Sequence, residues 1–398
     1  MDPHIPSEIW RIIFNFATFT VTCLNTRDWA PYWPHSRFCQ FSSPPPYYNV
    51  TLKTKKALVL VSRHFRDNSI GFMFEVVQLF DTHHAQLLSD TMHSHSSYPA
   101  KWIKSIIIVL DQKEDIEVMD ATLIRILPHC TNLNAFGWES PHLLQSSRSE
   151  GIRDKSSELL KCIPLGITIL GWKRTSLGES FNCLRIHGSL RQIRLRQVLP
   201  IIFGDTAVTI PSITHLEVRE TSTCASLSSW NLPSLSHLTI DWITGIQFGP
   251  LWNTIRSISI TDRRAGRPDI LPGIITRLPN LESLAYHIEV QMAGRKLEKS
   301  WLGVPNHRSL TDIYIYCHAP IGSQKDEPLC TVRELFSCHL HPIMIGSLSL
   351  LRNVHILNTR VVAEVPGCEE DLRTDGVKFF SNLSKLMSTP AVQVAFQT

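Results

Sequence analysis

Two groups of residues in the chain could in principle bind a metal, one of histidines near residues 83–95 and one of cysteine and histidines near residues 338–341, and each has too few ligands for a complete site. A structural zinc ion needs four cysteine, histidine or carboxylate ligands that converge on one point. Neither group has a carboxylate or further cysteine at ligand spacing, so we expect solvated loop residues in the first and alternating strand or loop residues in the second. The groups are His83, His84, His93 and His95, and Cys338, His339 and His341.

The short motifs of nucleotide binding and hydrolysis, GxGxxG, GxxxxGK[ST], GxSxG and HExxH, do not occur in the sequence. We therefore expect a protein that is not an enzyme, with no catalytic residue, no metal and no cofactor. The formal net charge of +4, from 39 Lys and Arg against 35 Asp and Glu, is small for 398 residues. Nucleic acid is not an expected partner, because binding the phosphate backbone needs a strong basic excess.

The ten cysteines are dispersed and contain no CxxC pair, which predicts neither a disulfide framework nor a zinc knuckle. The apolar run from Ile5 to Leu24 is interrupted by Glu8, Arg11 and Asn15, and no basic segment precedes it. Such a run is neither a signal peptide nor a membrane span. We expect a reduced, intracellular protein, cytoplasmic or nuclear, without a membrane partner.

The first 80 or so residues contain two apolar helical stripes. In the first, Ile5, Ile9, Ile12, Ile13 and Phe16 recur at the spacing of one helix face, with Pro6 in the first turn. A Pro-rich loop is predicted at about 25–52. Helical periodicity resumes at Thr54 and runs through Ala57–Phe65 until Gly71, and a β-prone segment follows at 72–79.

The segments Ile5–Phe14 and Ala57–Asp67 together resemble the F-box as fungal F-box-like proteins write it, L-P-x-E-I-x-x-x-I-F and then S-L-V-C-R-x-W-R-D. Ile5 stands for the opening Leu, Ser62 for the Cys and Phe65 for the Trp, and the loop between the halves is longer than in a compact F-box. The resemblance implies binding to a Skp-type adaptor of a cullin ubiquitin ligase. The positions that match adaptor contacts are Ile5, Pro6, Ile9, Leu60, Val61 and Phe65.

Beyond Lys101, an L-x-x-L-x-L-like unit recurs, as in Ile103/Ile106/Ile108 and Leu235/Leu238/Ile240. From Leu190 the units begin at 190, 213, 235, 255, 281 and 310, so successive starts are 20 to 29 residues apart. Each unit is one short strand that buries its L-x-L residues only when it stacks on its neighbours. Between Ser140 and Leu184 the repeat is obscure. Two fainter copies start at Val332 and Leu351.

These units resemble irregular leucine-rich repeats. The fold class that follows is α/β: a short helical F-box over 1–80, then an irregular leucine-rich-repeat solenoid over 81–398, a horseshoe with a parallel concave sheet. In such repeats the residue inside L-x-L and the one after it face the concave side. The residues that we expect to contact a protein target are Arg194, Arg196, Arg219, Asp241, Tyr314 and Tyr316.

The leading functional hypothesis is a substrate-recognition subunit of an SCF-type (Skp–cullin–F-box) ubiquitin ligase, which holds the adaptor through the F-box and a protein target through the repeats. A second hypothesis is a non-catalytic scaffold whose F-box-like module has lost adaptor binding, as the departures at Ile5, Ser62 and Phe65 permit. A third, an enzyme built on a repeat-like α/β body, would need an acid, base or nucleophile cluster in one deep pocket.

Overall fold

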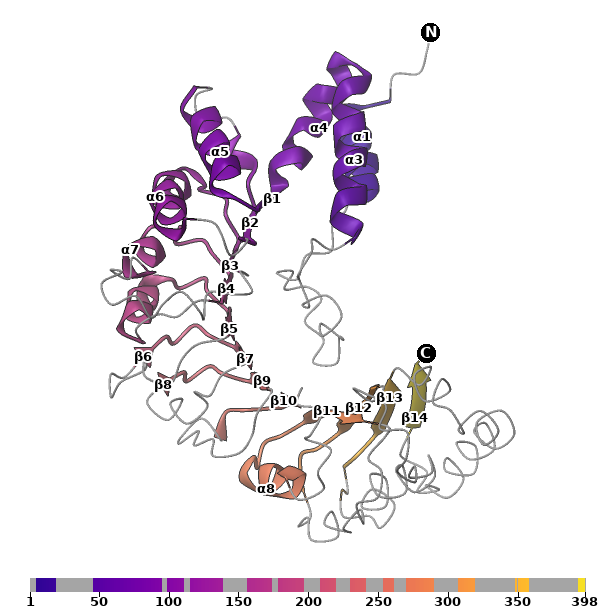
Figure 1. Ribbon diagram of the computed structural model, residues 1–398. Helices are drawn as coiled ribbons and strands as arrows, with labels where there is room; N and C mark the ends of the chain where they lie inside the picture. The colour runs from indigo at the N-terminus through magenta and orange to yellow at the C-terminus, as the bar shows by residue number, and fades with distance from the viewer. Residues whose placement is uncertain are drawn as a thin grey trace, which may run out of the picture. The chain divides into compact units, whose positions relative to one another are not determined.

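The chain is an α/β protein whose described strand pairs are all parallel and which forms two compact units (Figure 1). The N-terminal unit contains β1 to β6 and β8 with the first helices, and the C-terminal unit contains β7 and β9 to β14. No helix within the described residues is long and apolar enough to cross a membrane. The computed structural model describes residues 5–18, 46–94, 99–110, 115–138, 156–173, 178–196, 208–219, 230–240, 253–260, 270–289, 307–318, 348, 350–357 and 393–397.

Five parallel strands form the sheet of the N-terminal unit, and each pairs with the next one along the chain. The register aligns equivalent positions of successive units: Phe136 pairs with Ile106 and with Leu170. Sequential parallel pairing of short strands is what the repeat spacing predicts. The strands are β1 (Val76–Leu79), β2 (Ser105–Ile108), β3 (Ala135–Trp138), β4 (Ile169–Trp172) and β5 (Gln192–Arg196).

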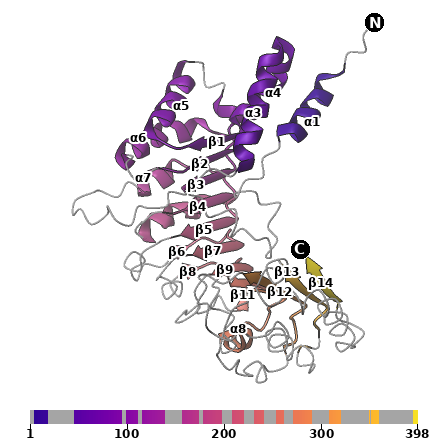
Figure 2. The ribbon, with the colours of Figure 1, turned by 45° about the vertical axis from the view of Figure 1, so that its right-hand side comes forward.

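Helical segments connect these strands, and α5, α6 and α7 lie along the same side of the sheet (Figures 1 and 2). Asp115 begins α6 because its carboxylate accepts hydrogen bonds from the Glu117 and Val118 amides. The helical segments are α5 (Thr82–Ser94), α6 (Ile116–Ile126) and α7 (Ser156–Lys161), with the 3₁₀ turns η1 (Ala100–Trp102), η2 (Leu127–His129) and η3 (Gly178–Ile186). The same unit also contains a separate parallel pair of short strands, β6 (Val208–Thr209) and β8 (Trp230–Asn231).

Among the described residues before the sheet there are three helices: α1 (Ser7–Thr18), α3 (Pro46–Val61) and α4 (Arg63–Glu75). The predicted loop at 25–52 is wrong over its last residues, because α3 begins at Pro46; proline is tolerated in a first helical turn, where its missing N–H has no partner to lose. The predicted break at Gly71 is also wrong. The indole of Trp102 packs 3.4 Å from where a Gly71 Cβ would lie, and α4 continues to Glu75.

The face of the sheet opposite α5–α7 is apolar in its first four strands. Val76, Ile107, Ala135 and Ile169 form a buried cluster there, and Leu52 of α3 packs against it. This helix therefore covers the start of the sheet, and the strand β1 joins the N-terminal helices to it. The predicted boundary at residue 80 lies inside this unit, directly after β1.

The C-terminal unit repeats the arrangement, and its described residues contain seven strands paired in chain order. The register again aligns the units, as for Leu238 with Ile258 and Ile258 with Leu284. One helix, α8 (Ile270–Arg277), is described between strands. The strands are β7 (His215–Arg219), β9 (His237–Ile240), β10 (Ser257–Ile260), β11 (Ser283–Glu289), β12 (Asp312–His318), β13 (Asn353–Leu357) and β14 (Gln393–Gln397).

The prediction that the L-x-L residues form a core is confirmed. From Ile106 and Ile108 to Val354 and Ile356, these side chains are at most 2% exposed. The strand β4 falls in the region where no repeat was assigned, yet Ile167, Leu170 and Trp172 have the same spacing and are equally buried. The copy predicted at Val332 lies outside the described residues.

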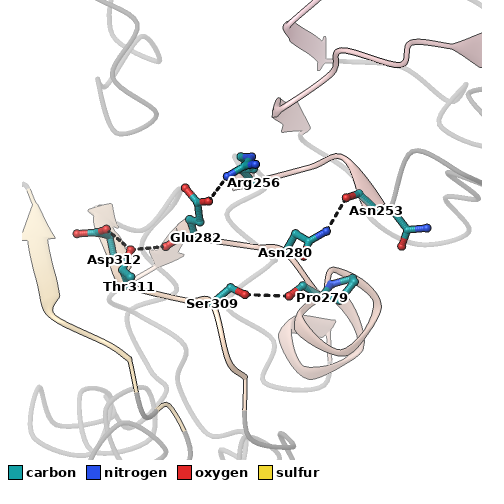
Figure 3. Close-up of polar contacts among 8 residues, drawn as sticks. All are labelled: Asn253, Arg256, Pro279, Asn280, Glu282, Ser309, Thr311 and Asp312. Carbon is teal, nitrogen blue, oxygen red and sulfur yellow. Dashed lines mark hydrogen bonds and ion pairs between the residues drawn. The ribbon is translucent and has the colours of Figure 1, made fainter.

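Side chains that precede the strands bind the backbone of the preceding repeat unit (Figure 3). The Asn280 amide donates to the Asn253 carbonyl at 2.8 Å, and the Ser309 and Thr311 hydroxyls donate to the Pro279 and Glu282 carbonyls at 3.2 and 3.0 Å. Short polar side chains of one unit therefore satisfy turn carbonyls of the unit before it.

Two buried histidines serve the same purpose. The His307 ring donates from Nε2 to the Leu278 carbonyl at 2.8 Å, while its Nδ1 accepts from the Ser309 and Leu310 amides. His187 donates from Nε2 to the Ile163 carbonyl at 3.1 Å. Both histidines are at most 6% exposed, so their rings give hydrogen-bond partners to buried backbone groups that water does not reach.

We expect Thr311→Val to lower the thermal midpoint by about 1–2 °C, because it keeps the side-chain shape but removes the hydroxyl that donates to the Glu282 carbonyl, a hydrogen bond worth about 1 kcal/mol net. Differential scanning calorimetry measures the shift. The matched comparison is Arg256→Gln, which breaks only the exposed ion pair with Glu282 and should change the midpoint little. Equal shifts in the two variants would contradict the bridging role of Thr311.

Candidate protein-docking site

Seven large apolar side chains on α1, just before it, and at the end of α3 are exposed to solvent, and we call them the apolar face. Several large apolar side chains exposed on packed helices are a candidate surface for another molecule to cover. The exposed fractions are Ile5 43%, Ile9 44%, Ile12 53%, Ile13 44%, Phe16 80%, Leu60 78% and Val61 62%.

The apolar face is exposed because α1 is apolar on two sides and uses the other side for packing. Trp10 and Phe14 turn toward α4, where their ring centroids lie 4.8 and 5.1 Å from that of Phe65. Phe14 is 2% exposed, and the Thr18 hydroxyl donates to its carbonyl at 2.6 Å. Three aromatic rings therefore fix α1 on α4, and the isoleucines remain outside this contact.

The corner between α3 and α4 sets the position of Leu60 and Val61. Ser62 is extended, with φ −162° and ψ 168°, and its hydroxyl accepts from the Phe65 amide at 3.2 Å. This N-cap ends α3 and starts α4, so the single helix expected over Ala57–Phe65 is two helices. A serine within an apolar run is the signal that could have revealed the break.

The helix α1 contacts both α3 and α4, and these helices, with Ile5 and Pro6 directly before α1, contain all six residues matched to adaptor contacts. Ile5, Pro6, Ile9, Leu60 and Val61 are exposed. Phe65 differs from them. It is half-buried between Trp10 and Phe14 and contributes to the internal packing of the helices.

The residues expected to contact a target lie in less open positions. Arg194, Tyr314 and Tyr316 are 1, 8 and 3% exposed, so they do not form the open concave face that the repeat pattern predicts. Arg194 is close enough to donate to the Gln192 side-chain oxygen from Nε and Nη2, at 2.8 and 3.1 Å. The side chains of Arg196 and Arg219 and the whole of Asp241 lie outside the described residues.

Flat rings stack across neighbouring strands of the C-terminal unit, on the face opposite the L-x-L core. Such rows come from the parallel register, which places equivalent positions of adjacent strands side by side. The repeat pattern places His287, Tyr314 and Tyr316 on this face but does not predict that their rings stack. The pairs are His215 with His237 (ring centroids 4.2 Å apart), Tyr314 with His355 (4.5 Å), and His287 with both Tyr316 (4.8 Å) and His318 (4.6 Å).

In the part of the chain that the structure describes, no three His, Cys, Asp or Glu side chains converge. His84 instead donates from its backbone amide to Asp81 Oδ1 and pairs through its ring with Oδ2, at 2.7 and 2.6 Å. Burial raises the pKa of the Cys130 and Cys317 thiols to about 12, so neither is a reactive thiolate at neutral pH. His95, Cys338, His339 and His341 lie outside the described residues.

Comparison with known proteins adds no family. No protein-family model matches the sequence, and no curated protein matches it.

Substitution of Phe65, which packs against α1, should destabilise the protein far more than substitution of Phe16 on the exposed side of α1. Phe65→Ala removes a half-buried ring from the aromatic contact and should cost about 2 kcal/mol of unfolding free energy, below the value of about 3–5 for a fully buried ring. Phe16→Ala, at an 80% exposed position, should change it by less than about 0.5 kcal/mol. Urea denaturation measures both. A large loss for Phe16→Ala would show that the apolar face is covered within the chain.

The His215–His237 stack predicts a loss of stability in acid. Burial lowers the pKa of His237 below its ordinary value of 6.5, an effect that Glu282 partly opposes. As the pH falls through 6.5, the unfolded chain therefore binds a proton before the folded chain does, and stability declines until the folded-state pKa is passed. His237→Phe keeps a stacking ring without the titration, so its thermal midpoint should fall less between pH 7 and pH 5. Identical pH profiles for the two proteins would contradict this account.

Proposed function

We propose that the protein is a substrate-recognition subunit of an SCF-type ubiquitin ligase, in which the apolar face of α1 and α3 binds a Skp-type adaptor. The single observation that carries the proposal is the exposure of Ile5, Ile9, Leu60 and Val61, four positions of the F-box resemblance, on packed helices. Fully burying one such side chain stabilises a complex by roughly 1.5–3 kcal/mol as an upper estimate. A partner helix laid on this face would gain several such contributions.

In this proposal the N-terminal helices are an F-box, and the strands after it are an irregular leucine-rich-repeat solenoid. Sequential parallel pairing, the buried L-x-L residues and the bonds between successive units support the repeat assignment. The repeat region would hold a protein target, with Arg196, Arg219 and Asp241 as the remaining predicted contacts, since Arg194, Tyr314 and Tyr316 are buried. No residue of this chain needs to be catalytic, because holding a target near the ubiquitin donor raises its effective concentration.

One observation favours the second hypothesis, a scaffold that does not bind the adaptor. Phe65, which stands at the Trp position of the F-box pattern, packs against Trp10 and Phe14 and offers only part of its ring to a partner. The first hypothesis is preferred because the remaining five matched positions are exposed and contiguous helices carry them.

Co-purification of the tagged full-length chain with a Skp-type adaptor tests the proposal. The wild-type chain should recover the adaptor, and Ile5→Asp with Ile9→Asp should abolish recovery, because each carboxylate would be buried without a partner in the complex. The matched control is Leu165→Asp with Ile186→Asp, which adds the same charges at positions that are 59 and 70% exposed.

Circular dichroism of each double variant controls for folding. Recovery of the adaptor by wild type and control but not by the first double variant supports the proposal. Equal recovery by all three would contradict it. A wild-type chain that recovers no adaptor and elutes as a dimer, which the first double variant converts to a monomer, would assign the apolar face to a second copy of the chain.

A further inference from the structure

The corner between α3 and α4 contains a contact that the F-box comparison does not account for. The last carbonyls of any α-helix lack amide partners within that helix. In α3 one of them, the Val59 carbonyl, accepts a hydrogen bond from Arg66 Nε at 3.3 Å. The donor belongs to the first turns of the next helix, so a single side chain links α3 to α4 across Ser62.

The charge of Arg66 strengthens this link. Carbonyls at a helix C-terminus have partial negative charge, and a cation placed there is favourable. The backbone of Arg66 is fixed as well, since its amide donates to the Ser62 carbonyl at 2.9 Å. Both the side chain and the main chain of this residue therefore hold the corner.

The neighbouring residue fixes the same turn of α4 to a different helix. Phe65 packs against Trp10 and Phe14 of α1, while Arg66 bonds to α3. Adjacent residues thus connect α4 to both helices that carry the apolar face. Leu60 and Val61, which lie between Val59 and Ser62, are 78 and 62% exposed, so packing does not hold their side chains.

We propose that Arg66 is a positioning residue of the docking site: its bond to the Val59 carbonyl holds Leu60 and Val61 in the orientation that the adaptor meets. This inference rests on the proposed function. Without the bond, Leu60 and Val61 would sample more orientations, and binding would have to order them at a cost in affinity.

The test compares Arg66→Met, Arg66→Lys and Arg63→Met in the full-length chain. Methionine keeps the apolar stem but removes the cation and its donor, whereas lysine keeps a cation with a different donor geometry. Arg63 is the matched control, because it is an exposed arginine in the same turn of α4. Adaptor affinity is measured by isothermal titration calorimetry.

We expect Arg66→Met to weaken adaptor binding about three- to tenfold, the effect of one charge-assisted hydrogen bond at an exposed site. Arg66→Lys should recover part of that loss, and Arg63→Met should bind as wild type does. Wild-type affinity in Arg66→Met, or an equal loss in Arg63→Met, would overturn the proposal.

Hydrogen exchange of the free chain separates positioning from direct contact with the adaptor. The Phe65 and Arg66 amides both bond to Ser62, and their exchange should accelerate at least about threefold in Arg66→Met, because the corner opens more often. Unchanged exchange would overturn the positioning role even if affinity falls. If the wild-type chain binds no adaptor, the proposed function fails, and exchange alone decides whether Arg66 braces the corner.

Discussion

The structure depends on one constraint: a short strand with an L-x-L pattern cannot bury its apolar residues alone. Parallel pairing with the next strand in sequence solves this, because the register aligns Phe136 with Ile106 and Leu170 and so extends one core from unit to unit. Each unit also has carbonyls at its turn. Side chains of the following unit, such as Asn280, Thr311 and His307, donate hydrogen bonds to them.

The N-terminal helices meet the same requirement in a different way. The sheet begins at β1, and α3 covers its first strands on one face through Leu52. The helix α1 is held by the aromatic contact of Trp10, Phe14 and Phe65 rather than by the sheet. Because one side of α1 satisfies the packing, its isoleucines are free to serve a partner, which is the physical basis of the proposed docking site.

The sequence predicts the periodic parts of this structure well and the tertiary parts poorly. L-x-L burial follows from the two-residue period of a strand, and even the unassigned β4 has that spacing at Ile167, Leu170 and Trp172. Gly71 lies against the indole of the distant Trp102 within α4, and the burial of Arg194 depends on its surroundings in the folded chain. Local patterns contain no information about such neighbours. The sequence predicts the exposed positions of α1 as an apolar stripe, and it also contains a signal for the break, since Ser62 interrupts an apolar run and caps α4.

The central claim is that the apolar face of α1 and the α3–α4 corner is where the adaptor binds. Hydrogen exchange of the full-length chain with and without a purified Skp-type adaptor tests it most directly. The account predicts slower exchange across Ser7–Thr18 and at Leu60 and Val61 in the complex, with the strands of both units unchanged. Binding without protection of α1, or protection confined to the strands, would contradict it.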